Sequence, residues 1–581
     1  MDKKYEKPPV IADEKYRFDS FGNGEVLFGK KHLPPMGWNS WNAFGSGNTE
    51  ELTRAMADKI VELGLDKLGY QFVVLDDGCY GPKRVDGHVT SDPKKFPSGF
   101  MAMSDYIHGK GLKFGMYNDV GSRLCSGLEV GTCGYEDVDV QDYVNWKIDF
   151  IKVDNCYNVW DNATFSDGAN ARFTFAPDIF GISIEGIGSI DAKDGTVTGS
   201  RAFVEGDRVT GIGTFDGTGP DASPVGLQSS ELQFTVNAPE AGEFDFVIDY
   251  KAGAVEGCGE WLQIAVGTDI YYDDFVSSEP VRIKLQTGEN VIRLMNHRRQ
   301  ENTLASYAKI QEEFAKQAPD RDVVFSICEW GKTQPQNWGY KVGDSWRILN
   351  DITFQVGSDG DAGHAAWEGA YTTSVTAQYN KAVIMDEFAG LGRGWNDPDM
   401  LMVGMDGLTE TMCRSHFALW CMLNAPLFLG MDLRKVEKGD WIYNIISNER
   451  LIALNQDALG VQAKRIFTTK AVAPDTTYIR DNDRIDVLAK PLADGSVALA
   501  IANVSLGERG DDIEVGMKLV KEYISGKAIN TQIFDANEFE VMDLWTGETK
   551  NIQGDVIRLR DFHEAPLAAC ECVVLKVKNP G

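Results

Sequence analysis

The chain has 581 residues, a length that suits two to four domains better than one. Hydrophobic residues make up 43% and charged residues 25% of it, which is a globular balance. The net charge of −30 argues against binding to nucleic acid or to an anionic membrane face, and no stretch approaches the ~18 apolar residues that span a bilayer.

The N-terminal residues 1–20 are polar and lack the apolar core of a secretory signal. This pattern predicts either a cytoplasmic protein or a secreted one whose signal was removed before this numbering begins. The ten cysteines show no CxxC spacing and there are only seven histidines, so we expect no structural metal site and no cofactor.

The first 157 residues alternate strand-like and helix-like patterns. Short apolar runs at 33–41, 70–78, 111–121 and 149–156 are typical of strands buried on both faces, and helical periodicity separates them, as at 49–65 and 135–148. Strands alternating with crossover helices predict a parallel sheet.

This rhythm stops between residues 158 and 303. Apolar and polar residues alternate with period two at 231–239, 242–250 and 279–296, separated by turn residues. The segment is therefore predicted to form an independent antiparallel β-sandwich.

The rhythm resumes with a helix from 304, followed by strand-like runs at 322–330, 343–351, 381–392 and 424–432. Eight strands in all predict an α/β fold: a (β/α)8 TIM barrel, interrupted after strand four by a β-sandwich insertion. From residue 465 the pattern is that of a C-terminal antiparallel β-sandwich. The expected domains are 1–157 and 304–464 for the barrel, 158–303 for the insertion, and 465–581.

Polar and aromatic residues gather where the predicted barrel strands end, which is the face that carries the active site in such barrels. An acid at a single strand end has an alternative role in capping the next helix, but six strand ends supply such groups. Carboxylates, cations and flat aromatic faces suit a sugar. In chain order these residues are Trp41, Asp76, Asp77, Tyr117, Asp119, Lys152, Asp154, Glu329, Trp330, Arg347, Asp351, Asp397 and Asp399.

Seven segments around these residues resemble, in order, the signature segments of glycoside hydrolase family 27, the α-galactosidases and α-N-acetylgalactosaminidases. They are PPMGWNSW, LDDGCY, KFGMYNDVGSRLC, FIKVDNC, ICEWG, SWRILND and GWNDPDML. The resemblance covers the barrel and the C-terminal sandwich but not the insertion. It implies a retaining exo-glycosidase that removes terminal α-D-galactosyl residues from oligosaccharides or glycoconjugates.

The resemblance also implies roles for individual residues. Asp154 corresponds to the catalytic nucleophile and Asp351 to the general acid/base. The positions that correspond to substrate-binding residues are Asp76 and Asp77 at the 6-OH and 4-OH, Lys152 at the 3-OH and 4-OH, Glu329 and Arg347 around the 2-OH, and Trp41, Tyr117, Trp330 and Asp399 along the pocket. Cys125 and Cys156 correspond to a pair that is disulfide-bonded in secreted relatives, although two reduced thiols remain equally open.

Physical chemistry supports the two catalytic assignments. A retaining glycosidase needs two carboxylates about 5 Å apart, one ionised for attack and one protonated for the leaving oxygen. Lys152 lies two residues before Asp154 on one strand, so both side chains point to the same face, and the lysine is expected to keep Asp154 ionised.

The insertion resembles carbohydrate-binding modules of family 35 or 6 through VNAPEAGEFDFVIDY and VRIKLQTGENVIRL. Whether it binds sugar or calcium, shapes the rim of the active site or mediates assembly into a homo-oligomer stays open. Three other functions also remain: an α-N-acetylgalactosaminidase, disfavoured because Glu329 is present; a β-L-arabinopyranosidase, disfavoured because Asp76 and Asp77 are present; and a non-catalytic carbohydrate-binding protein.

Overall fold

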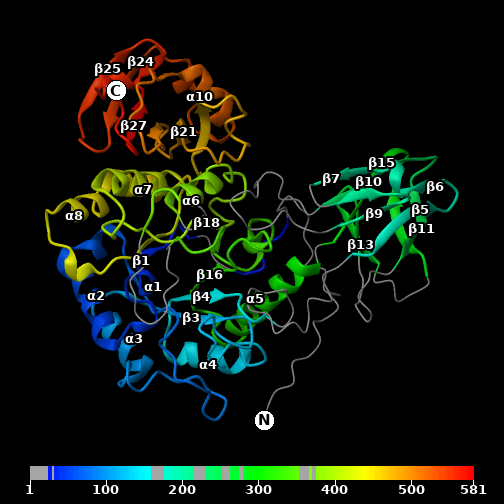
Figure 1. The fold of residues 1–581 in the computed structure, drawn as a ribbon, viewed down its shortest axis with the longest axis horizontal. Helices are drawn as coiled ribbons and strands as arrows, with labels where there is room; N and C mark the ends of the chain where they lie inside the picture. The colour runs from blue at the N-terminus through cyan, green and yellow to red at the C-terminus, as the bar shows by residue number, and fades with distance from the viewer. Residues whose placement is uncertain are drawn as a thin grey trace.

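The computed structural model describes residues 24–28, 32–158, 176–199, 202–212, 230–251, 262–273, 279–296, 298–352, 365–369, 374–564 and 566–580. Figure 1 shows a barrel of strands and helices in the centre, a second group of strands beside it, and the C-terminal strands above it.

An eight-stranded parallel sheet forms the centre of the molecule. Its hydrogen-bonded order is β18-β17-β16-β4-β3-β2-β1-β19. A parallel bridge between Leu401, which follows β18, and Leu429, in β19, closes the sheet into a barrel. The strands are β1 Met36–Asn39, β2 Phe72–Val74, β3 Lys113–Asp119, β4 Phe150–Asp154, β16 Val324–Cys328, β17 Ser345–Arg347, β18 Trp395–Asp397 and β19 Leu427–Leu429.

The barrel interior is filled by apolar side chains from several of its strands. The Phe150 ring packs against two others, with centroid distances of 5.5 Å to Phe72 and 5.1 Å to Phe428. Val74, Val324, Met400 and Trp41 complete this cluster. Because the interior is packed, the chemistry of the barrel is confined to the carboxyl ends of its strands.

Helices surround the sheet, and their ends follow from local sequence. Thr49 caps α2 by accepting the Leu52 amide, and Gly64 ends that helix in the left-handed conformation that glycine tolerates. The helices outside the C-terminal domain are α1 Trp41–Phe44, α2 Glu50–Leu63, α3 Gly99–Gly109, α4 Glu136–Asn145, α5 Arg298–Gln317, α6 Val375–Ala382, α7 Glu410–Met422, α8 Trp441–Ile446 and α9 Glu449–Asn455. Among the described helices, none is long and apolar enough to cross a membrane.

The prediction for the seventh strand is wrong. Residues 381–392 hold the end of α6 and the turns after it, and the strand is β18, at Trp395–Asp397. The helix-turn segment is apolar because it is buried: Val383 and Met385 are wholly enclosed. A short buried apolar run does not distinguish a strand from a helix end, and the true strand is only three residues long.

Between β4 and β16 the chain forms two antiparallel sheets around one apolar core. The five-stranded sheet has the order β13-β12-β15-β10-β7, and the other has the order β14-β11-β5-β9-β8 with β6 paired to β5. Their strands are β5 Asp178–Ile184, β6 Gly188–Asp191, β7 Thr196–Thr198, β8 Phe203–Glu205, β9 Arg208–Thr210, β10 Glu231–Ala238, β11 Gly242–Lys251, β12 Leu262–Val266, β13 Asp269–Asp273, β14 Val281–Leu285 and β15 Gly288–Met295.

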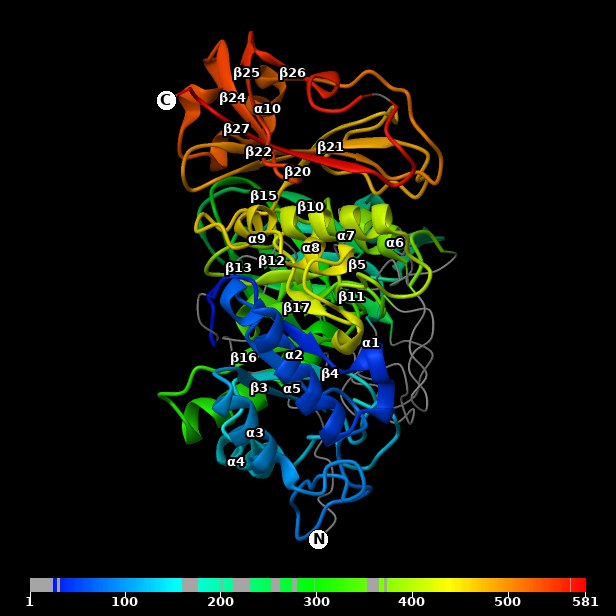
Figure 2. The ribbon, with the colours of Figure 1, turned by 90° about the vertical axis from the view of Figure 1, so that its left-hand side faces the viewer.

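The C-terminal domain is built on a six-stranded antiparallel sheet of order β20-β21-β22-β27-β24-β25. A two-stranded sheet, β23 with β26, and one helix, α10, accompany it. Figure 2 shows this domain stacked on α6, α7 and α9 of the barrel. The elements are β20 Lys464–Thr468, β21 Ile485–Pro491, β22 Val497–Asn503, β23 Glu514–Gly516, α10 Met517–Ile524, β24 Glu538–Asp543, β25 Thr549–Gln553, β26 Val556–Arg558 and β27 Cys572–Lys578.

A buried charged cluster joins this domain to the barrel. Asp486 on β21 is fully enclosed and contacts two enclosed guanidinium groups, Arg465 at 3.3 Å and Arg484 at 3.0 Å. Tyr379 of α6 donates its hydroxyl hydrogen to the same carboxylate at 3.0 Å, and Arg484 donates to Asn380 at 2.5 Å. The cluster therefore includes side chains from both domains.

Candidate active site

Asp154 is the last residue of β4 and is 5% exposed. The Tyr117 hydroxyl donates to its Oδ2 at 2.7 Å, whereas its Oδ1 is buried without a hydrogen-bond partner among the described residues. Burial raises the pKa of Asp154 to about 7; the Lys152 charge and the nearby Cys328 thiol oppose this shift, and the Asp76 and Asp351 charges add to it. One oxygen of this carboxylate is thus held while the other is left unbonded.

Lys152 forms its direct ion pair with Asp76 at 2.8 Å. Asn39 Nδ2 also donates to Asp76 at 2.8 Å. Burial alone would lower the pKa of Lys152, but the Asp76 carboxylate raises it well above its ordinary value. The expectation that Lys152 favours the ionised form of Asp154 agrees with the direction of its charge effect. Its direct ion pair, however, is with Asp76, which follows β2, two strands away from β4 in the sheet.

Asp77, which follows Asp76 after β2, is fixed by a residue that the sequence reasoning did not single out. Ser126 donates its backbone amide to Asp77 Oδ2 at 2.8 Å and its hydroxyl to Oδ1 at 2.9 Å. Burial raises the pKa of Asp77, and the two Ser126 bonds oppose that shift. The serine is 49 positions away in sequence, and only its place beside Cys125 could have drawn attention to it.

Arg347, the last residue of β17, is shared by two carboxylates. Its Nη2 lies 3.0 Å from Asp351 Oδ1 and 2.8 Å from Asp399 Oδ2. The Asp351 side chain is 12% exposed, more than that of Asp399 at 3%. Burial raises the pKa of Asp399 and the Arg347 charge opposes the shift; burial likewise raises that of Asp397, to about 6. The guanidinium thus joins Asp351 and Asp399 in one charge network.

The remaining predicted residues lie at other strand ends. Glu329, directly after β16, is fully buried and accepts from the amide and hydroxyl of Thr333 at 2.7 and 2.8 Å. Trp330 is half-buried with a φ of 60°, and the Lys332 ammonium lies 4.3 Å from its ring centroid. Trp41 begins α1 and packs on the barrel's interior cluster.

A cavity of about 30 Å³ lies under these groups, between the charged residues and the aromatic interior of the barrel. Lys152, Arg347 and Asp399 contribute to its lining, as do Phe150 and Phe428. The site therefore has a polar rim and an apolar floor.

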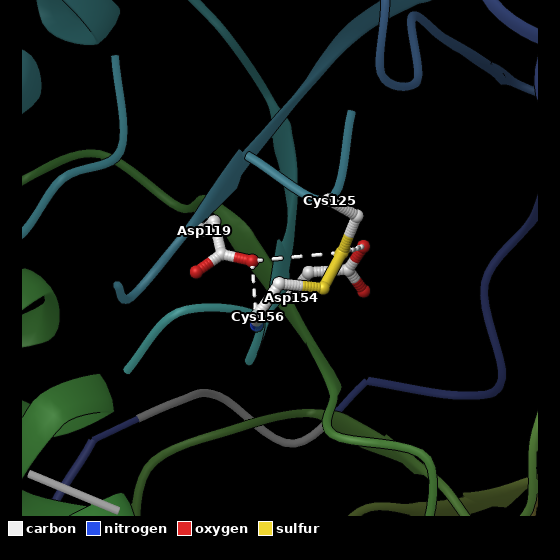
Figure 3. Close-up of side chains that lie close together, drawn as sticks. All are labelled: Asp119, Cys125, Asp154 and Cys156. Atoms are coloured by element: carbon white, nitrogen blue, oxygen red, sulfur yellow. Dashed lines mark hydrogen bonds between the residues drawn. A yellow bond between two sulfur atoms is a disulfide. The ribbon is translucent and has the colours of Figure 1, made fainter. Parts of the chain in front are cut away.

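A disulfide joins Cys125 and Cys156 beside Asp154 (Figure 3), as the family resemblance implies. Cys125 Sγ lies 3.2 Å from Asp154 Oδ2. These two sulfurs and the carboxylates of Asp119 and Asp154 lie within 4.8 Å of one another. Because disulfide sulfurs are not thiolates, this group lacks the charged sulfur ligands that a metal site of cysteines needs. Cys79 and Cys328 are buried free thiols.

Comparisons with known proteins agree with this geometry. The family model for alpha galactosidase A matches residues 33–176 and 295–457, more than half of the chain, and that for the alpha galactosidase C-terminal beta sandwich domain matches 482–577. The chain is 27% identical over 554 residues to an alpha-galactosidase of Cyamopsis tetragonoloba, covering 95% of this chain and 88% of that one.

Two solved structures share the fold. Alpha-galactosidase I of Mortierella vinacea has a TM-score of 0.59 and 22% identity, and the comparison covers 94% of this chain and 97% of that one. The alpha-galactosidase of Saccharomyces cerevisiae with raffinose has a TM-score of 0.58 and 19% identity, with coverage of 94% and 97%. With the family models covering the barrel and the C-terminal sheet, the chain belongs to the alpha-galactosidase family, glycoside hydrolase family 27.

Proposed function

We propose that this protein is a retaining α-galactosidase in which Asp154 attacks the anomeric carbon and Asp351 is the acid/base. Family membership supports the reaction class. The observation that carries the residue assignment is the unequal treatment of the two oxygens of Asp154. Tyr117 holds Oδ2, and Oδ1 has no partner in the described chain, which leaves one lone pair for bond formation.

In the first step Asp154 Oδ1 forms a bond to the anomeric carbon as the glycosidic bond breaks. Asp351 gives its proton to the leaving oxygen. Bond formation removes the charge of Asp154, which burial disfavours in the free enzyme, so the covalent state relieves that unfavourable charge.

In the second step Asp351 takes a proton from water, and the water oxygen displaces Asp154 from the anomeric carbon. Two displacements at one carbon retain the α configuration. The Arg347 guanidinium lies 3.0 Å from Asp351 and 2.8 Å from Asp399, so it can hold the Asp351 side chain in place through both steps.

Recognition of the sugar falls to the carboxylates and cations around Asp154. Asp76 and Lys152 form one ion pair, so a sugar hydroxyl placed beside it meets both a donor and an acceptor. Asp77, Glu329 and Arg347 supply further groups, and Trp41, Tyr117, Trp330 and Asp399 complete the proposed pocket. An oligosaccharide such as raffinose, which is bound in the yeast structure, is a suitable substrate class.

Two other family activities remain less supported. An acetamido group at C2 would need space beside Glu329, which is present here and fully buried. A sugar without a hydroxymethyl group would not need the paired Asp76 and Asp77. A purely binding protein would need neither Asp154 nor Asp351.

We further propose that residues 158–303 form a module inserted between the two barrel segments, 1–157 and 304–464, which contributes to the rim of the site or binds sugar. The C-terminal domain spans 465–581. The Cys125–Cys156 disulfide supports a location in an oxidising compartment rather than in the cytoplasm. Analytical ultracentrifugation of the purified protein would show whether it forms the homo-oligomer that the insertion could mediate.

Turnover of p-nitrophenyl α-galactoside, followed by proton NMR of the first sugar product, tests the proposal. We expect α-galactose to form first and to mutarotate afterwards. Initial release of β-galactose would overturn the retaining mechanism, and no turnover of any α-galactoside would overturn the function.

A further inference from the structure

The loop that follows β3, residues 120–134, is fixed at its base by one carboxylate. Asp119 is fully buried; its Oδ1 accepts the Gly121 amide at 2.6 Å and its Oδ2 accepts the Cys156 amide at 2.7 Å. Figure 3 shows Asp119 beside Asp154 and Cys156. We call residues 120–134 the β3–α4 loop. Because Cys156 lies two residues beyond Asp154, the carboxylate of Asp119 joins this loop to the end of β4.

The loop continues along the segment that follows β4. The Val120 amide donates to the Asp154 carbonyl at 3.0 Å, and the Ser122 amide donates to the Tyr157 carbonyl at 3.2 Å. At Gly121 a Cβ atom would lie 2.0 Å from the Cys156 carbonyl oxygen, so only glycine permits this approach. The disulfide then adds a covalent link between the two segments at Cys125.

Directly after that disulfide, the same loop reaches the other side of the site. Ser126 directs its amide and its hydroxyl to the two oxygens of Asp77, at 2.8 and 2.9 Å. A tight turn supports it, in which the Gly127 amide donates to the Leu124 carbonyl at 2.8 Å. Hydrogen bonds, a disulfide and one serine thus connect Asp154 to Asp77.

We propose that the β3–α4 loop sets the position of Asp77 relative to Asp154, and that Ser126 is a positioning residue for sugar recognition. The inference rests on the proposed function, in which Asp154 attacks the sugar that Asp77 helps to hold. Both oxygens of Asp77 are oriented by one residue, and the adjacent cysteine is linked to the strand end that carries Asp154. Ser126 itself acts only through Asp77.

The test compares three serine variants by the inhibition constants of galactose and its deoxy analogues. Ser126→Ala removes the hydroxyl donor, Ser126→Thr restores it, and Ser122→Ala is the matched control, since the Ser122 hydroxyl is buried in the same loop without a hydrogen-bond partner in the described structure. Hydrogen bonds to charged groups are strong, so we expect Ser126→Ala to raise the inhibition constant of galactose about tenfold, with the other two variants near wild type.

The analogues separate positioning from general damage. Ser126→Ala should reduce the preference for galactose over 4-deoxygalactose or 6-deoxygalactose, because Asp77 serves that side of the sugar. The preference over 2-deoxygalactose should not change. If all three preferences fall together, or if none of the inhibition constants moves, the assignment of Ser126 is wrong.

The role of the disulfide is tested by a double-mutant cycle that combines Ser126→Ala with the Cys125→Ser/Cys156→Ser variant. If the loop transmits position, that variant should itself weaken galactose binding, and adding Ser126→Ala to it should cost less than twofold more. Additive effects would overturn the role of the disulfide. If the double variant does not fold, phosphine reduction of wild type and Ser126→Ala measures the same coupling.

Turnover of p-nitrophenyl α-galactoside by wild type keeps the two proposals apart. An inactive wild-type enzyme contradicts the proposed function. An active wild type whose Ser126→Ala variant binds every analogue normally contradicts only this inference.

Discussion

The two proposed catalytic carboxylates are held in different ways. Asp154 is inside the sheet, paired in register with Asp119 of β3 on one side and Cys328 of β16 on the other. Asp351 lies four residues beyond the end of β17, is more exposed than Asp154, and forms an ion pair with Arg347. A nucleophile must meet one carbon at a fixed distance, whereas an acid/base must accept and release a proton; rigidity suits the first task and access to water suits the second.

The largest expected effect comes from Asp154→Asn, which replaces the rigidly held carboxylate that is proposed to bond to the sugar. Turnover should fall by about 10⁴-fold or more, because the amide cannot act as the nucleophile. Steady-state kinetics on p-nitrophenyl α-galactoside measure this. A variant that keeps a tenth of wild-type activity contradicts the assignment.

A stability measurement controls that result. Burial raises the pKa of Asp154 to about 7, so the folded state binds more protons than the unfolded state between the ordinary carboxyl value and pH 7. Stability from this group therefore falls as pH rises through that window. Asp154→Asn removes this unfavourable contribution, so its melting temperature at pH 8 should equal or exceed that of wild type.

Asp351→Ala tests the role of the more exposed carboxylate, the proposed acid/base. Substrates with poor leaving groups should lose about 10²- to 10⁴-fold in rate, and activated aryl galactosides much less, since only the former need protonation. Azide should restore the second step and give β-galactosyl azide. Recovery of the α-azide by NMR would mean that the enzyme inverts.

Glu329→Ser, combined with a small residue at Trp330, tests recognition away from both carboxylates. A carboxylate that accepts from a sugar hydroxyl discriminates more strongly than pocket size, which gives about 1–3 kcal/mol per methylene. The ratio of activity on N-acetylgalactosaminides to that on galactosides should rise at least tenfold. An unchanged ratio would mean that Glu329 does not face C2.

Tyr117→Phe removes the hydroxyl that donates to Asp154. That bond favours the ionised form, so its loss should raise the pKa of Asp154 above its value of about 7. The acidic limb of kcat/KM should move up by about 1 pH unit, a tenfold loss at low pH. The same profile for Tyr80→Phe, whose hydroxyl donates to the Tyr117 carbonyl, is the control, and equal shifts in both would indicate a general disturbance.

Replacing residues 178–295 by a short linker should have the smallest effect. Hydrolysis of small aryl galactosides should stay within about threefold, while oligosaccharides whose outer sugars reach the module should be hydrolysed more slowly. Tyr272→Phe in the full chain is the control. It removes a contact between the module and the barrel, the hydrogen bond from the Tyr272 hydroxyl to the buried Glu301 of α5 at 2.8 Å, while keeping the module in place. An equal loss on both substrate types would show that the module supports the barrel itself.

The sequence predicted most of the barrel because most of its strands are short apolar runs that end at or just before a polar residue, as in FIKVD at β4. The prediction failed at strand seven, because Val383 and Met385 form an apolar run that is buried after a helix and not in a strand. Strand ends also indicated which residues converge, since neighbouring parallel strands end together.

Contacts between segments were harder to predict. The Ser126–Asp77 bonds depend on the path of a loop, and no periodicity encodes that path. Lys152 pairs directly with Asp76 and not with Asp154, and the sequence does not show which of these two carboxylates lies closer to the ammonium group. The disulfide came from the family resemblance and not from spacing.

The charged cluster around Asp486 limits how far this enzyme can be shortened. Ending the chain near residue 464 would remove Asp486 and both arginines, and would leave Tyr379 and Asn380 of α6 facing water where they now contact the cluster. The C-terminal sheet also contributes Leu488, Ala500 and Val574 to the same buried apolar cluster as the barrel helices, so the truncation would expose apolar surface at a cost of about 25 cal/mol per Å². A shortened form of this chain that still folds and acts as a catalyst would therefore have to keep the C-terminal sheet, which covers this face of the barrel.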